Sequence, residues 1–211
     1  THNDPERENA CIQAITQGWM DGVLFVSAGD PTTGLASLHK SHIPVVAIDR
    51  IPVDYDGMWV TMDNYRAGVL AAEHLLSLGH THIAHIRGPE TLQLAREREK
   101  GFRKVLSAQG LGLVSPSNEA KSWACASGYQ EMKDLLQSGL KISAVFAASD
   151  RPAIGAIHAI NESGLRVPED ISIIGVDDIE VAAYMTPPLT TIRQSFTALA
   201  EKSVELLMSI L

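Results

Sequence analysis

The sequence predicts an α/β fold in which mostly parallel strands are covered by helices on both faces. Two features of the chain support this. Short, β-prone apolar runs alternate with segments whose apolar residues recur at helical spacing. The apolar runs are also continuous instead of alternating with polar residues, and few of them are joined by two-residue turns. Continuous runs are typical of strands that helices bury on both sides.

In the first half of the chain, capping residues mark where helices begin and end. A helix is predicted to start at Asp4, an N-cap that is followed by proline at the first helical position. A second helix is predicted for residues 64–78, and Gly79 stands just past its end. The strands predicted in this half are residues 23–26, 45–48, 59–62 and 82–86.

The second half continues the alternation. Helices are predicted through Phe102, Met132 and Ile157, each ending at a glycine, and over residues 195–211. The predicted strands are residues 144–148 and 171–176. In such sheets, ligands bind beyond the carboxyl ends of the strands. Position alone therefore makes candidates of Ser27, Asp49, Arg87, Ser149, Asp150, Asp177 and Asp178.

Composition argues against several classes of protein. The 211 residues carry 17 Lys and Arg against 25 Asp and Glu, a formal net charge of −8, which disfavours a chain that grips nucleic acid by itself. No apolar run approaches the roughly 20 residues of a membrane span. Cys11 and Cys125 are too few for a disulfide framework and favour a reducing compartment. Cys11 is expected on the buried face of the first helix.

Signatures of catalysis are mostly absent. The run Gly29–Gly34 matches the start of a phosphate-binding loop but lacks the Lys and the Ser or Thr that should follow, so a plain loop is preferred. His80, His82 and His85 suggest a metal site, but the last two point to opposite faces of a strand. The sequence therefore predicts no enzyme, no metal and no cofactor, with an α/β enzyme as the weakest alternative.

Five segments stand in one order and spacing: Glu73–His80, Ala95–Phe102, Val145–Asp150, Val167–Asp178 and Pro187–Gln194. Together they closely resemble the effector-binding core of the lactose/galactose repressor (LacI/GalR) family of bacterial transcription regulators, over essentially the whole chain. The last two segments are quite specific to the regulators. Periplasmic sugar-binding proteins share the fold but usually lack the Pro-Pro-Leu-Thr-Thr-Ile-Arg-Gln segment.

The resemblance implies a two-lobed, type I periplasmic-binding-protein-like fold, each lobe a mostly parallel sheet flanked by helices. The expected lobes are residues 1–61 with 168–193 (an incomplete N-terminal lobe) and 62–167 with 194–211 (the C-terminal lobe). The chain would cross between them near residues 61–63, 168–175 and 190–195. A small ligand would bind in the cleft between the lobes, and lobe rotation would be the signal. The DNA-binding head of the family is absent from this sequence and is expected upstream.

The resemblance also assigns two charged residues to the ligand. Arg98, three residues before Gly101, matches an effector-binding arginine whose guanidinium could hold two vicinal hydroxyls. The alternative is a solvated arginine paired with its charged helical neighbours. Asp150 matches an effector-contacting aspartate, and the alternative is a helix N-cap.

Four further positions are weaker candidates. Trp123 matches an aromatic that often stacks on the ligand, unless it is a loop anchor packed into its own lobe. Asp49 matches a cleft-facing acid, with a turn residue as the alternative. Ser149 stands where some relatives have Asn, and Ser27 is a candidate by position alone. The Asp177-Asp178 pair is predicted to bond between lobes or within loops more than to a ligand.

The chain is therefore predicted to be the ligand-sensing core of a LacI-type regulator. The expected effector is a sugar or sugar derivative, and a purine, which would also stack on Trp123, stays open. The family implies a cytoplasmic homodimer that binds operator DNA through the missing helix-turn-helix and has no membrane partner. The ligand would bias the dimer toward one arrangement and so change operator affinity. The alternative is a periplasmic sugar-binding protein that feeds a transporter.

Overall fold

The computed structural model of the chain describes residues 5–18, 20–26, 32–51, 55–115 and 122–211. The backbone divides into two compact units. Unit 1 contains Thr1–Met62, Thr91–Leu94 and Ser195–Leu211, and unit 2 contains Asp63–Glu90 and Ala95–Gln194. The strand pairs of both sheets are parallel. The predicted α/β class, with parallel sheets flanked by helices, is confirmed.

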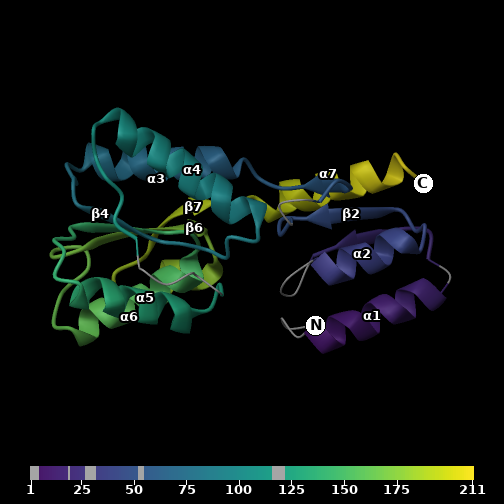
Figure 1. Ribbon diagram of the computed structural model, residues 1–211, viewed down its shortest axis with the longest axis horizontal. Helices are drawn as coiled ribbons and strands as arrows, with labels where there is room; N and C mark the ends of the chain where they lie inside the picture. The colour runs from purple at the N-terminus through teal and green to yellow at the C-terminus, as the bar shows by residue number, and fades with distance from the viewer. Residues whose placement is uncertain (1–4, 19, 27–31, 52–54, 116–121) are drawn as a thin grey trace. The chain divides into compact units, whose positions relative to one another are not determined.

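Unit 1 is built on a three-stranded sheet in the order β1 (Val23–Phe25), β2 (Val45–Ile48) and β3 (Met58–Val60). Helices α1 (Pro5–Gln17) and α2 (Thr32–Lys40) cover one face, and α7 (Phe196–Met208) covers the other (Figure 1). Apolar side chains fill both layers. The α1–α2 side contains Ile12, Val23, Phe25, Leu35, Leu38, Ala47 and Ile51, and the α7 side contains Val46, Val60 and Leu199.

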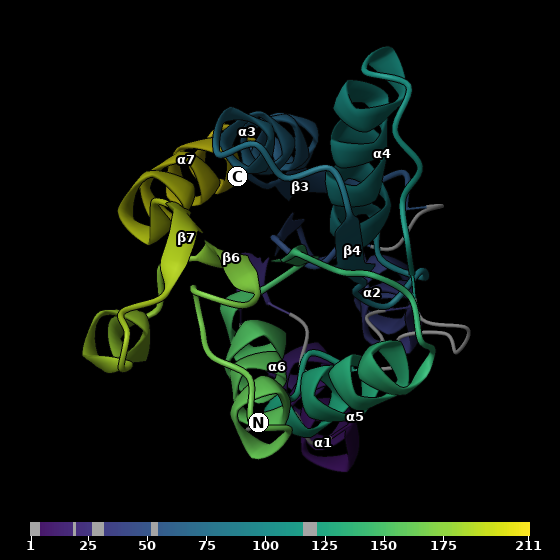
Figure 2. The same ribbon diagram turned by 90° about the vertical axis from the view of Figure 1, so that its left-hand side faces the viewer.

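Unit 2 is built on a four-stranded sheet in the order β4 (Ile83–Ile86), β5 (Ala144–Ala147), β6 (Ser172–Asp177) and β7 (Thr190–Arg193). Helices α3 (Asn64–Ser77) and α4 (Gln93–Ala108) lie on one face, and α5 (Cys125–Gln137) and α6 (Asp150–Glu162) lie on the other, as Figure 2 shows. The short 3₁₀ helix η1 (Glu180–Tyr184) stands between β6 and β7. Every residue of β4 and β5 is buried, which explains their continuous apolar runs.

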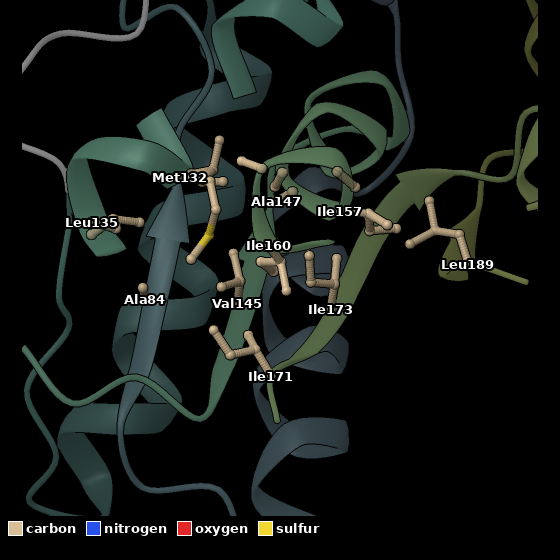
Figure 3. Packing of buried hydrophobic residues seen from close by; sticks show 14 of the residues in the cluster. Ala84, Met132, Leu135, Val145, Ala147, Ile157, Ile160, Ile171, Ile173 and Leu189 are labelled. Carbon is tan, nitrogen blue, oxygen red and sulfur yellow. The ribbon is translucent and has the colours of Figure 1, made fainter. Parts of the chain in front are cut away.

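The main core of unit 2 lies between the sheet and the α5–α6 pair (Figure 3). Met132 and Ile160 from the helices and Val145 from β5 are fully buried there. On the opposite face, the rings of His85 and Phe102 both stack on Phe146, with centroids 4.6 Å from it. Both faces of this sheet are therefore sealed by packed side chains.

Glycines let the covering helices of unit 2 approach each other closely. A Cβ atom on Gly68 of α3 would lie 1.9 Å from the carbonyl oxygen of Arg98 in α4. A Cβ atom on Gly155 of α6 would lie 1.8 Å from the carbonyl oxygen of Cys125 in α5. Any larger residue would force the helices apart. The contact at Gly68 also fixes the position of α4 along α3, and with it the position of Arg98.

The expected lobe membership of the last third of the chain is wrong. The predicted crossing near residues 168–175 does not occur, because β6 and β7 continue the sheet of β4 and β5, with Ala144 opposite Ser172 and Ile174 opposite Thr190. Residues 168–193 therefore belong to unit 2. Residues 195–211 belong to unit 1, where Leu199 of α7 packs with β2 and β3.

Three elements, of which one is the unpredicted 3₁₀ helix η1, and one cysteine differ from expectation. Helix α2 was not predicted, and the expected Gly29–Gly34 loop falls partly outside the described residues. Strand β7 was not predicted, because this partly exposed edge strand lacks an apolar run. Cys11 is exposed, while its neighbour Ile12 takes the buried position of α1. Both cysteines are free thiols.

The histidines that suggested a metal have other partners. His80 Nδ1 and Nε2 lie 3.0 and 3.1 Å from the hydroxyls of Ser143 and Ser172, and His85 Nδ1 lies 2.9 Å from the carbonyl oxygen of Phe146. Within the described ranges, no three His, Cys, Asp or Glu side chains are placed to hold a metal ion. Among the helices described above, none is both long and apolar enough to cross a bilayer.

Candidate functional site

Three polar side chains of unit 2 meet at the carboxyl ends of β5 and β6. Ser149 Oγ donates a hydrogen bond to Asp177 Oδ2 at 2.6 Å, and Arg98 Nη2 lies 3.5 Å from Asp177 Oδ1. Because parallel strands end at the same edge of a sheet, residues far apart in the sequence come together there. The Asp177 side chain is 20% exposed, so this carboxylate can accept hydrogen bonds from a polar molecule.

Arg98 is held by the protein on several sides. Its Nε donates to Asn64 Oδ1 at 2.8 Å and its Nη1 donates to the carbonyl oxygen of Ala148 at 2.5 Å. The residue is 1% exposed. The alternative of a solvated surface arginine is therefore wrong: the close approach of α3 at Gly68 buries this side of α4. These contacts fix the planar guanidinium in one orientation.

Asp150 joins three parts of unit 2. It lies in the first turn of α6, whose N-cap is Ser149, so the interpretation of Asp150 as the N-cap is wrong. Its Oδ1 accepts from Thr191 Oγ1 of β7 at 2.6 Å, and its Oδ2 accepts from the Ile179 N–H at 3.0 Å. Burial raises the pKa of this carboxyl to about 6. Its bonds stabilise the edge of the sheet that carries Asp177.

Trp123 lies against a glycine of its own unit. A Cβ atom on Gly88, just past β4, would lie 2.0 Å from the Trp123 ring. The ring is half-buried, and its Nε1 is buried without a partner among the described residues.

Asp49 lies in unit 1, directly after β2, with a φ of 66° and its N–H bonded to the carbonyl oxygen of Val60. Ser27 lies outside the described residues.

Asp177, which the sequence predicted to bond between lobes or within loops more than to a ligand, belongs to this cluster. Both Asp177 and Asp178 have positive φ, 118° and 57°, so the chain turns sharply at the end of β6. The turn sends the two side chains to different partners: Asp177 faces Ser149 and Arg98, whereas Asp178 accepts from Arg193. The available signal was position, since Asp177 directly follows the apolar run of β6.

A second buried carboxyl lies near the end of β4. Glu131 of α5 is 6% exposed, and its Oε1 accepts from Ser127 Oγ at 3.1 Å. Its Oε2 is buried and has no partner among the described residues. Burial raises the pKa of Glu131 to about 7, against the opposing effect of nearby Arg87. This group was not singled out from the sequence, because an acidic residue in a helix is usually solvated.

Comparison with known proteins gives consistent relatives. A family model described as a periplasmic binding protein-like domain matches residues 72–211. The ribose operon repressor of Escherichia coli (strain K12) is 33% identical over 210 residues, covering 99% of this chain and 63% of the repressor. The chain thus spans less than two thirds of that relative's length.

Solved structures agree with this relationship. A LacI family transcriptional regulator from Enterococcus faecium, solved with bound ribose, is 30% identical with a TM-score of 0.79, over 95% of this chain and 74% of that one. The lac repressor dimer bound to operator and the anti-inducer ONPF is 29% identical with a TM-score of 0.79, over 96% and 71%. These relatives are transcription regulators and not enzymes.

Proposed function

We propose, given that this chain belongs to the periplasmic binding protein-like domain family and within it to the LacI-type regulators, that it is the effector-sensing core of a transcription regulator. The observation that carries the proposal is the Arg98–Ser149–Asp177 cluster at the carboxyl edge of the unit 2 sheet. The relatives favour this function over that of a periplasmic sugar-binding protein.

The proposed effector is a sugar or sugar derivative. A sugar hydroxyl can donate to the oriented Asp177 carboxylate and accept from the Arg98 guanidinium. The indole of Trp123 offers a flat apolar surface of the kind that covers the C–H face of a sugar ring. The related Enterococcus faecium regulator was solved with ribose, which supports this class of ligand. No cofactor is proposed.

The remaining candidates take secondary parts in this proposal. Asp49, which directly follows β2, is proposed as a further ligand contact, and so is Ser27, which follows the predicted strand 23–26 in the sequence. Asp150 is proposed to support the site rather than to bind, because it is fully buried and bonded to Thr191 and Ile179, whereas the Asp177 side chain is 20% exposed.

Effector binding would act by population shift. The ligand would bind one arrangement of the two units more tightly and so favour it in a homodimer, which would change operator affinity. Operator contact would come from a part of the protein outside these 211 residues. The related lac repressor was solved as a dimer bound to its operator, which supports a second copy of the chain and operator DNA as the two proposed partners. The free thiols Cys11 and Cys125 are compatible with the cytoplasm.

The decisive experiment compares two neighbouring aspartates. Wild type, Asp177→Asn and Asp178→Asn are titrated by calorimetry with ribose and a panel of other mono- and disaccharides. A sugar should bind the wild type, and Asp177→Asn should weaken it roughly 10- to 100-fold, because a charged acceptor is lost. Asp178→Asn is the matched control, since its carboxylate pairs with exposed Arg193. Unchanged affinity in Asp177→Asn, or no binding of any sugar, would contradict the proposal.

The proposed homodimer is tested by a separate measurement. Sedimentation of the protein with and without the sugar identified above should show a dimer in both states, because the proposed signal alters the arrangement of the dimer and not its formation. A monomer at concentrations well above those used for operator binding would remove the proposed coupling between two DNA-reading parts.

A further inference from the structure

A cavity of about 600 Å³ lies beside the exposed side of α4 in unit 2, next to the segment after β4. Five cations line it: Arg87, Arg96, Lys100, Arg103 and Lys104. Two carboxylates, Glu90 and Glu99, also line it, which leaves an excess of three positive charges. The whole chain has a net charge of −8, so this cavity has the opposite sign to the protein around it.

The cavity is separate from the Arg98 cluster. Residues 96, 103 and 104 each stand three or four positions from residue 100, so the four share one side of α4. Arg98 lies on the opposite side of the helix, where it contacts Asn64 and Asp177. A molecule in the cavity would therefore occupy a different surface of α4 from the proposed effector.

Pairs within the cavity neutralise only part of its charge. Arg87 lies 2.6 Å from Glu90, and Arg103 lies 2.5 Å from Glu99. Arg96 donates its Nε to the backbone carbonyl oxygen of Glu90, which carries no net charge. In the described part of the chain, neither Arg96 nor Lys104 has a carboxylate partner. Arg87 is 18% exposed in its side chain, whereas Lys100 and Arg103 are 68% and 51% exposed, so most of the cations that line the cavity reach solvent.

The spacing of the cations adds a reason to expect a bound anion. Arg96, Lys100 and Lys104 follow one another at intervals of four residues, so they lie in a row along α4. Like charges at this spacing repel each other and destabilise a helix. Lys100 relieves part of this through Glu97, at 3.3 Å. An anion bound between Arg96 and Lys104 would attract both cations and so offset the repulsion that remains between them.

We propose that this cavity is a second binding site, which takes a small organic phosphate. A phosphoryl group carries close to two negative charges and three strong acceptor oxygens, and these suit an arginine fork beside lysine ammonium groups. The volume is within the range of small-molecule sites and larger than a phosphoryl group needs, which leaves room for an organic body.

Inorganic pyrophosphate is a suitable probe of this site. It is titrated by calorimetry at low ionic strength into wild type and into the double variant Arg96→Gln, Lys104→Gln. The matched control is the double variant Lys141→Gln, Arg166→Gln, which removes the same charge from exposed positions of unit 2 outside the cavity. The cavity variant should lose about tenfold in affinity, the control variant about twofold or less, and added salt should weaken binding.

Several results would overturn the site. These are an absence of saturable pyrophosphate binding to wild type, equal losses in the two double variants, or full affinity in the cavity variant. A small-molecule site would also be rejected if a duplex oligonucleotide bound to wild type more tightly than to the cavity variant while pyrophosphate did not bind. Because the sugar titration of Asp177→Asn concerns the other side of α4, the two proposals can fail independently.

Discussion

Ser149 Oγ donates a 2.6 Å hydrogen bond to Asp177 Oδ2 and so ties the segment after β5 to the end of β6. The other oxygen of the same carboxylate faces Arg98. The two contacts come from different directions and hold the plane of the carboxylate. Ser149 is therefore an orienting residue for Asp177, which gives it a role independent of any direct contact with a ligand.

Arg98→Ala should destabilise the protein as well as weaken effector binding. The substitution removes the guanidinium that donates to Asn64 and Ala148 and pairs with Asp177. Because these acceptors are left without that partner in a buried setting, the free energy of unfolding should fall by about 3 kcal/mol. Urea unfolding monitored by circular dichroism measures this cost. Arg103→Ala, which breaks a half-exposed pair with Glu99, is the control and should cost less than about 1 kcal/mol. Equal stabilities of the two variants would refute the structural part of this role.

Asp150→Ser and Asp150→Asn should differ in stability. Serine is too short to reach both the Thr191 hydroxyl and the Ile179 N–H, so it should cost about 2 kcal/mol. Asparagine keeps one acceptor of the right reach and should cost less. Differential scanning calorimetry at neutral pH gives both values. If serine were tolerated as well as asparagine, a simple capping role for Asp150 would be restored.

Glu131→Gln should change how stability depends on pH. Burial raises the pKa of Glu131 in the folded protein from 4.5 to about 7, so the folded state holds this proton more tightly than the unfolded chain does. The stabilisation is fully present below about 4.5 and is lost as the pH rises through 7. Above that pH, the glutamine variant should be more stable than wild type by up to about 3 kcal/mol.

Urea unfolding at a series of pH values measures this difference. Some decline should remain in the variant between pH 3.8 and about 6, because the pKa of buried Asp150 is raised in the same direction. A constant difference between wild type and Glu131→Gln across the whole series would show that the carboxyl does not titrate in this way.

Gly155→Ala should push α5 and α6 apart. The added methyl group would lie 1.8 Å from the carbonyl oxygen of Cys125, and backbone must move to make room, at a cost of about 3 kcal/mol. Gly112→Ala is the matched control, because a Cβ atom there meets nothing within 4 Å. Thermal unfolding should show a clear loss for the first variant and little change for the second. Similar melting temperatures would mean that the helix pair can relax at no cost.

Local patterns in the sequence were enough to place most helices and strands of the fold. The apolar runs at 45–48 and 144–148 coincide with β2 and β5, because buried parallel strands must be apolar throughout. Strand β7 has no such run, since it lies at the edge of its sheet and is recognised by its pairing with β6. Lobe membership failed for the same reason: it depends on which strands pair, and pairing is not encoded in local periodicity.

The sequence predicted which residues lie at the carboxyl ends of the strands, but not how deeply they are buried or which groups they bond. Arg98 has charged neighbours in sequence, so nothing local indicated that Gly68 would let α3 approach and bury it. Asp150 was predicted to contact the effector, with an N-cap as the alternative, and the N-cap position falls on Ser149, one residue earlier at the helix boundary. Its true partners, such as Thr191, lie about forty residues away and become visible only in the folded chain.

The anchoring of Arg98 by Asn64, Ala148 and Asp177 has a thermodynamic consequence for recognition. A side chain already confined to one rotamer loses little conformational entropy when a ligand arrives. Discrimination between similar ligands would then depend on how many of their hydroxyls match fixed directions, so an epimer with one misplaced hydroxyl would be rejected instead of accommodated. Exchanging Ser149 for another small polar residue could retune that choice and leave the scaffold unchanged.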